Sequence, residues 1–436
     1  MKKLCKAVSV LAMAAMMALG GCGGGSGDSG EIPTDKEGNS VVKIMFHVDA
    51  KSAEGQAYKK RIEEFNKAYK DQKIKAAAQY VARTAGAADY EQTLTGMQNE
   101  GSLPDIITFD APNCASYAKS GLLYDISKLV PKDVQDDFLS LNKYDGKLYG
   151  LPIQESSAGF FYNKNIFRDA GVDVSGYTVD NPWTFDQFKD ACRKIKGIGK
   201  TAVDMRLDAT KDETATYLLY PFIYAAGGEF LSADGYTAKG YFNSAETRNG
   251  FQFIKDLVTE NYTSYEIGAT DFFTGKVGMY LSSGWTIPEL DNSGYDAFPN
   301  RDAWGLLPYP KGTASASATG SWSFAITDNH HEDKTAIKEL LLWLVTPESS
   351  KGITTATGMI PARKSVESNF GAGSPEEVLL SQLEKTGRER PVTVGYPQFS
   401  NNFRQIIYAM KTKDLATVLN EKAATLQAEL DLLKNI

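Results

Sequence analysis

The chain has 436 residues and a formal net charge of −7, with 42% hydrophobic and 23% charged residues. This composition is that of a globular protein, and dispersed charges with an acidic excess exclude a nucleic-acid partner, which would need clustered Lys and Arg. About 395 residues follow position 40. Because one hydrophobic core rarely grows that large, we expect two lobes.

The N-terminus predicts a lipoprotein signal peptide over residues 1–21. Lys2, Lys3 and Lys6 precede an apolar run at 8–19 that is too short to span a bilayer, and small residues lead to Cys22. We expect cleavage before Cys22 and acylation of this cysteine, with palmitate among the acyl chains. The lipid would hold the protein at the outer, extracytoplasmic face of the cytoplasmic membrane, its only membrane contact.

Residues 22–40 begin with a Gly- and Ser-rich stretch that has few side chains able to pack a core. We expect a flexible tether there, which would place the folded body on the order of 25 Å from the membrane.

An alternation of strands and helices then predicts an α/β fold in which each lobe has a mostly parallel sheet flanked by helices. The periodicity predicts strands at 41–48, 74–82, 105–109 and 159–162, and helices at 54–69, 90–100, 249–260, 332–344 and 415–433. A further helix begins at Phe185, because Thr184 and Gln187 have the spacing of a capping box.

Two cysteines remain in the folded body, Cys114 and Cys192, without the CxxC spacing of a metal site. The compartment permits a disulfide, but two buried thiols on separate elements are the expected arrangement. We expect no metal and no cofactor.

Two tryptophans occur in Gly- and Ser-rich settings outside the periodic elements, Trp285 and Trp322. A sugar ring has a flat apolar face and an edge of hydroxyl groups, so aromatic platforms with a polar rim recognise it. The sequence leaves open whether these indoles contact a sugar or only pack between loops.

Signatures of catalysis are sparse. The three histidines are His47, His330 and His331, none in the i,i+4 pairing of a zinc helix, and neither G-x-S-x-G nor G-x-G-x-x-G is present. Two carboxylates suffice to cleave a glycosidic bond, so a glycosidase built on Asp110 and Glu155 remains an alternative.

A series of short motifs occurs in one order along the chain. They are Pro104-Asp105-Ile106-Ile107, Tyr117-Ala118-Lys119-Ser120-Gly121-Leu122-Leu123, Gly146-Lys147-Leu148-Tyr149-Gly150-Leu151-Pro152-Ile153, Tyr162-Asn163-Lys164, Pro182-Trp183-Thr184-Phe185, Phe273-Thr274-Gly275-Lys276-Val277-Gly278-Met279 and Met359-Ile360-Pro361-Ala362-Arg363. In this order they resemble family 1 of the extracellular solute-binding proteins, the maltose-binding-protein group that serves sugar ABC importers.

The resemblance implies two lobes of the type II periplasmic-binding-protein fold, joined by a hinge that the chain crosses three times. Lobe 1 would comprise 41–151 and 304–358, and lobe 2 would comprise 152–303 and 359–436. It also implies a monomeric binder without a catalytic step, which captures a carbohydrate, such as an oligosaccharide, between the lobes. The partner would be an ABC permease with a cytoplasmic ATPase.

The resemblance also suggests ligand contacts, which fall after the first and third strands, at the first crossing, at the two tryptophans and near the C-terminus. They are His47, Asp49, Phe109, Asp110, Asn113, Glu155, Trp285, Trp322, Phe403 and Arg404. Arg83, in the loop after the second strand, is a further candidate, because a guanidinium donates paired hydrogen bonds to hydroxyls or to a carboxylate. If Arg83 or Arg404 paired with ligand, the cargo would be charged, such as glycerol phosphate or a uronate.

Overall fold

The computed structural model describes residues 31–83, 89–208, 212–292, 294–320, 322–329 and 331–434. The predicted signal peptide and Cys22 lie outside the described residues. Within this part of the chain, no helix combines the length and the apolar character needed to cross a membrane.

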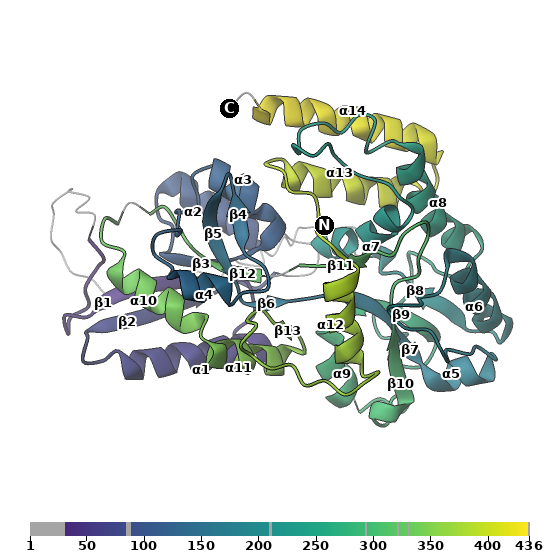
Figure 1. The fold of residues 1–436 in the computed structure, drawn as a ribbon, viewed down its shortest axis with the longest axis horizontal. Helices are drawn as coiled ribbons and strands as arrows, with labels where there is room; N and C mark the ends of the chain where they lie inside the picture. Colours follow the sequence, from purple (N-terminus) through teal and green to yellow (C-terminus); the bar gives the residue numbers. More distant parts are fainter. Residues whose placement is uncertain are drawn as a thin grey trace, which may run out of the picture.

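The described chain forms two lobes, each built around its own sheet (Figure 1). The first sheet has the order β2-β1-β3-β12-β5-β4. Its strands are β1 (Ser40–Phe46), β2 (Ile74–Tyr80), β3 (Ile106–Asp110), β4 (Asn142–Tyr144), β5 (Lys147–Pro152) and β12 (Trp322–Ile326). The second sheet has the order β10-β7-β9-β8, with β7 (Ala158–Asn163), β8 (Thr201–Asp204), β9 (Val277–Ser283) and β10 (Trp304–Leu307).

Most strands of each sheet share one direction, as predicted. In the first lobe β1 is parallel to β2 and β3, and β12 runs antiparallel between β3 and β5, so β2, β1, β3 and β5 are aligned. In the second lobe β8 is parallel to β9, while β7 runs antiparallel between β9 and β10. Strands β3, β7 and β9 are buried along their whole length, which is why they lack the alternation of apolar and polar residues that a half-exposed strand shows.

Helices cover both sheets. The first lobe has α1 (Ala53–Ala68), α2 (Asp89–Glu100), α3 (Cys114–Lys119), α4 (Lys132–Asp136), α10 (Thr335–Leu344) and α11 (Pro347–Thr357). The second lobe has α5 (Lys164–Asp169), α6 (Phe185–Gly197), α7 (Glu213–Ala225), α8 (Ala245–Thr259), α9 (Thr286–Asn292), α12 (Pro375–Lys385), α13 (Tyr396–Ala409) and α14 (Leu415–Lys434). The predicted capping box is confirmed at the start of α6, where the Gln187 backbone N–H donates to the Thr184 hydroxyl.

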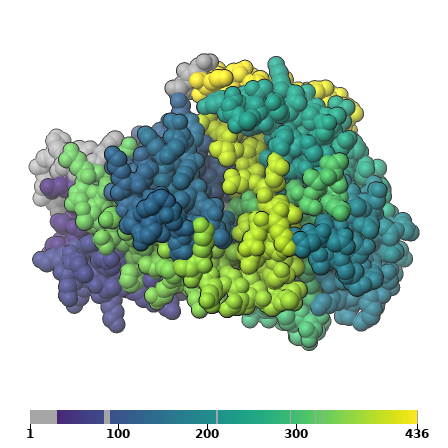
Figure 2. Space-filling model, viewed as in Figure 1, coloured from purple at the N-terminus to yellow at the C-terminus, as the bar shows by residue number. Residues whose placement is uncertain are grey.

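The chain crosses between the lobes through segments that pair with one another. The first crossing contains β6 (Gln154–Glu155), and the third contains β13 (Ile360–Pro361), which is antiparallel to β6. The second crossing passes Gly320, which forms an antiparallel bridge with Ser156. Beside them, β11 (Ser317–Ala318) pairs with β14 (Gly387–Arg388), and in Figure 2 the yellow-green C-terminal segment lies between the blue and teal lobes.

Two predicted boundaries need correction. Strand β10 pairs with β7, so residues 304–307 belong to the second lobe, and the return crossing lies between Ala318 and Trp322 instead of at Trp304. The predicted tether is also too long, because residues 31–39 fold back against the first lobe. There Asp35 accepts hydrogen bonds from Asn39, and Ile32 packs against the core.

The two cysteines behave as expected. Cys114 is buried in the first lobe and Cys192 in the second, and both thiols are free. They belong to separate hydrophobic clusters.

A candidate ligand-binding cleft between the lobes

A cavity of about 560 Å³ lies between the two lobes. The first lobe, including α11, lines it with His47, Val48, Asp49, Ser52, Ala53, Glu54, Ala82, Arg83, Asp110, Trp322, Ala356 and Thr357. The crossing segments and the second lobe line it with Gln154, Ser156, Gly320, Glu213, Thr214, Tyr217, Trp285, Pro288, Met359 and Arg390. Its volume and its mixed apolar and polar lining are those of a small-molecule site.

The ends of the strands explain which side chains the first lobe contributes to the cavity. His47 follows β1, Arg83 follows β2, and Asp110 is the last residue of β3. Because these parallel strands end at the same edge of the sheet, their side chains meet there, as ligand-binding groups do in open α/β sheets. The antiparallel β12 begins at this edge, so Trp322 pairs with Asp110 and joins the same group.

Trp322 is held by its neighbours in the first lobe. The His47 imidazole lies parallel to the indole, with ring centroids 3.4 Å apart and an interplanar angle of 3°. His47 is itself fixed by Thr108, since Nδ1 and the Thr108 hydroxyl are 3.0 Å apart. Burial, helped by the Arg83 charge, lowers the pKa of His47 well below its ordinary value. A neutral imidazole therefore covers part of the Trp322 ring.

Trp285 faces the cavity from the second lobe. It follows β9, directly before α9, and its side chain is 41% exposed. The only ring contact the structure gives it among the described residues is with Tyr217, at 5.9 Å between centroids. An exposed indole at the wall of a cavity leaves apolar surface for a ligand to cover.

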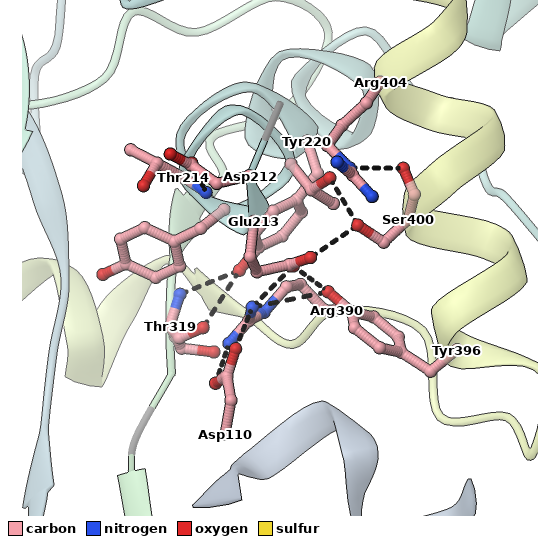
Figure 3. Close-up of polar contacts among 12 residues, drawn as sticks. Asp110, Asp212, Glu213, Thr214, Tyr220, Thr319, Arg390, Tyr396, Ser400 and Arg404 are labelled. Carbon is pink, nitrogen blue, oxygen red and sulfur yellow. Dashed lines mark hydrogen bonds and ion pairs between the residues drawn. The ribbon is translucent and has the colours of Figure 1, made fainter. Parts of the chain in front are cut away.

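A buried charge cluster joins the lobes (Figure 3), and three of its residues, Asp110, Glu213 and Arg390, line the cavity. The Arg390 guanidinium donates to both oxygens of Asp110, from Nη2 to Oδ1 at 2.7 Å and from Nη1 to Oδ2 at 2.9 Å. Nη1 also donates to Glu213 Oε1 at 2.8 Å. Burial acts to lower the pKa of Arg390, but the Asp110 and Glu213 charges and the neighbouring Tyr396 raise it well above its ordinary value. The Arg390 guanidinium therefore stays charged and hydrogen-bonded to both carboxyl groups.

Glu213 is anchored within the second lobe. It occupies the first position of α7, after the N-cap residue Asp212, where the helix dipole favours a carboxylate. The hydroxyls of Tyr396 and Ser400 donate to its two oxygens. Arg390 therefore has one carboxylate partner in its own lobe and one, Asp110, in the other.

The remaining charges of the cavity belong to the first lobe. Arg83 Nε lies 3.2 Å from Glu91 Oε1, and its guanidinium carbon lies 5.2 Å from the Trp322 ring centroid. The Tyr58 hydroxyl donates to Glu54 at 2.5 Å, and burial raises the pKa of Glu54 to about 6. Asp49 is exposed beside them.

Six of the predicted contact residues line this cavity: His47, Asp49, Arg83, Asp110, Trp285 and Trp322. Their contact with ligand stays a prediction. The structure adds that four of them already contact protein groups: Asp110 pairs with Arg390, Arg83 lies beside Glu91, and His47 stacks on Trp322.

The other five predicted residues lie elsewhere. Phe109 points away from the cavity, because it precedes Asp110 in β3 and so faces the opposite side of the sheet, where it is buried near Tyr117. Phe403 is fully buried in the second-lobe core, with Phe251 5.2 Å away between centroids. Arg404 donates to the Ser400 carbonyl within α13, and Asn113 does not line the cavity.

Glu155 lines a different cavity. Successive residues of a strand face opposite sides, so Gln154 and Ser156 face the cleft, whereas Glu155 faces a second cavity of about 350 Å³. There the Ser140 hydroxyl donates to it, and burial raises the pKa of Glu155 to about 7. Asp110 and Glu155 therefore do not share a cavity, and the predicted glycosidase pair is not formed.

Several lining residues were not predicted, chiefly Glu213, Tyr217 and Arg390. The Asp-Glu-Thr run at 212–214 before an apolar stretch signals a helix start and could have indicated Glu213. No local pattern marks Arg390, because its partner Asp110 is 280 residues away along the chain.

The two lobes, the paired crossings and the cavity between them define a two-lobed ligand-binding protein. A family model described as bacterial extracellular solute-binding protein matches residues 60–376, which is more than half of the chain. The chain therefore belongs to the bacterial extracellular solute-binding proteins, as its motifs suggested.

Named relatives and solved structures agree with this assignment. The chain is 26% identical over 334 residues to the diacetylchitobiose binding protein DasA of Streptomyces coelicolor, covering 72% of each chain. It is 24% identical over 343 residues to a galactooligosaccharide-binding protein of Bacillus subtilis, covering 75% of each. The crystal structure of the cyclic alpha-maltosyl-1,6-maltose binding protein from Arthrobacter globiformis matches with a TM-score of 0.73 at 23% identity, over 90% of this chain and 99% of that one. This last likeness shows the fold.

The position of Phe403 generates a first prediction. Replacing Phe403 by Ala should lower the free energy of unfolding by about 3–5 kcal/mol, because it leaves a cavity in a well-packed core. Denaturant-induced unfolding of the variant and of wild type measures this difference. An unchanged midpoint would contradict the core assignment.

The raised pKa of Glu155 generates a second prediction. The folded state holds this proton more tightly than the unfolded state, so the stabilisation is present below about pH 4.5 and is lost as pH rises through about 7. Over that window wild type should lose up to about 3 kcal/mol relative to Glu155→Gln, which cannot titrate. Unfolding both proteins at pH 5 and pH 8 tests this, and an identical pH dependence would refute it.

Proposed function

We propose that this protein is the lipid-anchored, extracytoplasmic receptor of an ABC importer, which captures a carbohydrate between its lobes and delivers it to a permease. The observation that carries the proposal is the inter-lobe cavity with one tryptophan from each lobe, Trp322 and Trp285, and a rim of polar side chains. Aromatic faces bind the apolar side of a sugar ring, while carboxylates, amides and hydroxyls accept and donate at its edge.

The relatives support the proposal that the ligand is a carbohydrate. Those named above bind diacetylchitobiose and galactooligosaccharides, and a further one is an arabinooligosaccharide-binding protein of Bacillus subtilis. Because these oligosaccharides differ, we propose the class of ligand and not its identity. The anchoring part of the proposal rests on the sequence around Cys22.

A charged cargo held by Arg83 or Arg404 is less well supported. Arg83 is already paired with Glu91, and Arg404 lies outside the cavity on α13. The alternative of an extracellular glycosidase is also less well supported, because its two proposed carboxylates, Asp110 and Glu155, face different cavities. We therefore propose a binder that releases its sugar unchanged.

The function is tested by thermal unfolding of the protein without residues 1–22 against a panel of neutral oligosaccharides. A ligand that binds only the folded state adds about 2.7 kcal/mol at 100-fold excess over its dissociation constant. A selective rise in melting temperature, with the sugar recovered intact, is the expected result. If no sugar in the panel raises the melting temperature, the proposal of a carbohydrate ligand is contradicted. If the sugar is recovered cleaved, the protein is an enzyme.

Trp285 provides the sharper prediction. Replacing Trp285 by Ala should weaken binding of the sugar found above about 30-fold, the effect of removing a hot spot of ~2 kcal/mol. Tyr408→Ala is the matched control, because Tyr408 is an exposed aromatic residue that does not line the cavity. Titration calorimetry measures both variants, and equal affinities of wild type and Trp285→Ala would refute the stacking role.

A further inference from the structure

The pairing of Arg390 determines what the cavity offers to a ligand. A guanidinium binds a carboxylate through two parallel hydrogen bonds, and this geometry makes arginine the usual partner of carboxylate ligands. In this cleft Asp110 already takes that position, with bonds of 2.7 and 2.9 Å from the two terminal nitrogens. A carboxylate on a ligand would have to displace Asp110 to reach Arg390.

Both partners of the Arg390–Asp110 pair are buried. Only 5% of Arg390 and 6% of Asp110 are exposed. Without Asp110, Arg390 would keep Glu213 as a carboxylate partner, but its Nη2 and one further bond of Nη1 would lose their acceptors. A free carboxylate that fits beside Arg390 could accept those two hydrogen bonds in a protein lacking Asp110, but finds them taken in one that has it.

The charged residues that line the cavity are acidic on balance. Among the described residues that line it, the acidic ones are Asp49, Glu54, Asp110 and Glu213, and the cationic ones are Arg83 and Arg390. The difference is 4 − 2, or two negative charges when all are ionised and His47 is neutral. Arg83 has the Glu91 carboxylate 3.2 Å from its Nε, so a negatively charged ligand would meet an acidic surface in which each arginine already has a carboxylate beside it.

We propose that Asp110 sets the charge specificity of this cleft: by occupying Arg390, it makes the receptor reject sugars that carry a carboxylate and select uncharged ones. This inference rests on the proposed function, because it assumes that a carbohydrate enters the cavity. It assigns to Asp110 a role other than the direct ligand contact that the resemblance implied. Asp110 acts by exclusion, through the arginine of the opposite lobe.

The test replaces Asp110 by Ala and supplies carboxylates in solution. The probes are sodium acetate, D-glucuronate and D-galacturonate, with D-glucose and D-galactose as their neutral counterparts, all at one ionic strength. The measurement is the melting temperature of the protein without residues 1–22 as a function of probe concentration. Asp110→Asn is examined in parallel, because it preserves the side-chain volume if the alanine variant does not fold.

The matched control is Glu229→Gln. Glu229 pairs with Arg388 at 2.8 Å, close to Arg390 in the sequence, but it does not line the cavity. The substitution removes the same charge and breaks a single hydrogen bond to an arginine at the surface. It therefore reports any effect of net charge that does not involve the cleft.

Asp110→Ala and Asp110→Asn should bind the uronates about tenfold more tightly than wild type, the effect of about one new charge-assisted hydrogen bond. Acetate should stabilise Asp110→Ala saturably, and Glu229→Gln should resemble wild type. The proposal is overturned if wild type binds uronates as tightly as the variants, or if the folded variants gain no affinity for any carboxylate. Failure of the proposed function would look different, since neutral sugars would then leave wild type unshifted while the carboxylate comparison still gives its own answer.

Discussion

A guanidinium removed from water needs carboxylates in fixed positions, and this requirement determines how the two lobes meet. Arg390 is held from its own lobe by Glu213, and from the other lobe by both oxygens of Asp110. Breaking such a buried pair by removing one partner typically costs about 3–5 kcal/mol. Because Glu213 would keep Arg390 compensated if the lobes separated, the cluster permits opening without leaving a bare buried charge.

The cleft beside this cluster follows from how the strands are ordered. Parallel strands of the first sheet bring their carboxyl ends to one edge, and the antiparallel β12 begins at the same edge after crossing from the second lobe. The crossing is therefore what places Trp322 next to His47. The second lobe brings Trp285 at the end of β9, so the two indoles reach the same cavity from opposite sides. A ligand between them would contact both lobes.

Much of the fold could be predicted from the sequence, because each lobe repeats a strand-helix alternation whose hydrophobic period is local. The site was harder, because its contacts join distant residues. Phe403 illustrates a signal that was available: Phe399, Phe403 and Ile407 are spaced four residues apart in α13, so they share one buried face. For Glu155 no such signal was available, because an error of one residue along a strand assigns a side chain to the wrong face of that strand. The pairing of Asp110 with Arg390 required the three-dimensional structure.

The most direct test is a crystal structure of the protein with the neutral oligosaccharide that raises its melting temperature most. The account predicts a sugar ring against Trp285 in the inter-lobe cavity, with both hydrogen bonds between Asp110 and Arg390 intact beside it. A ligand group bound to Arg390 in place of Asp110, or a sugar bound outside this cavity, would contradict it.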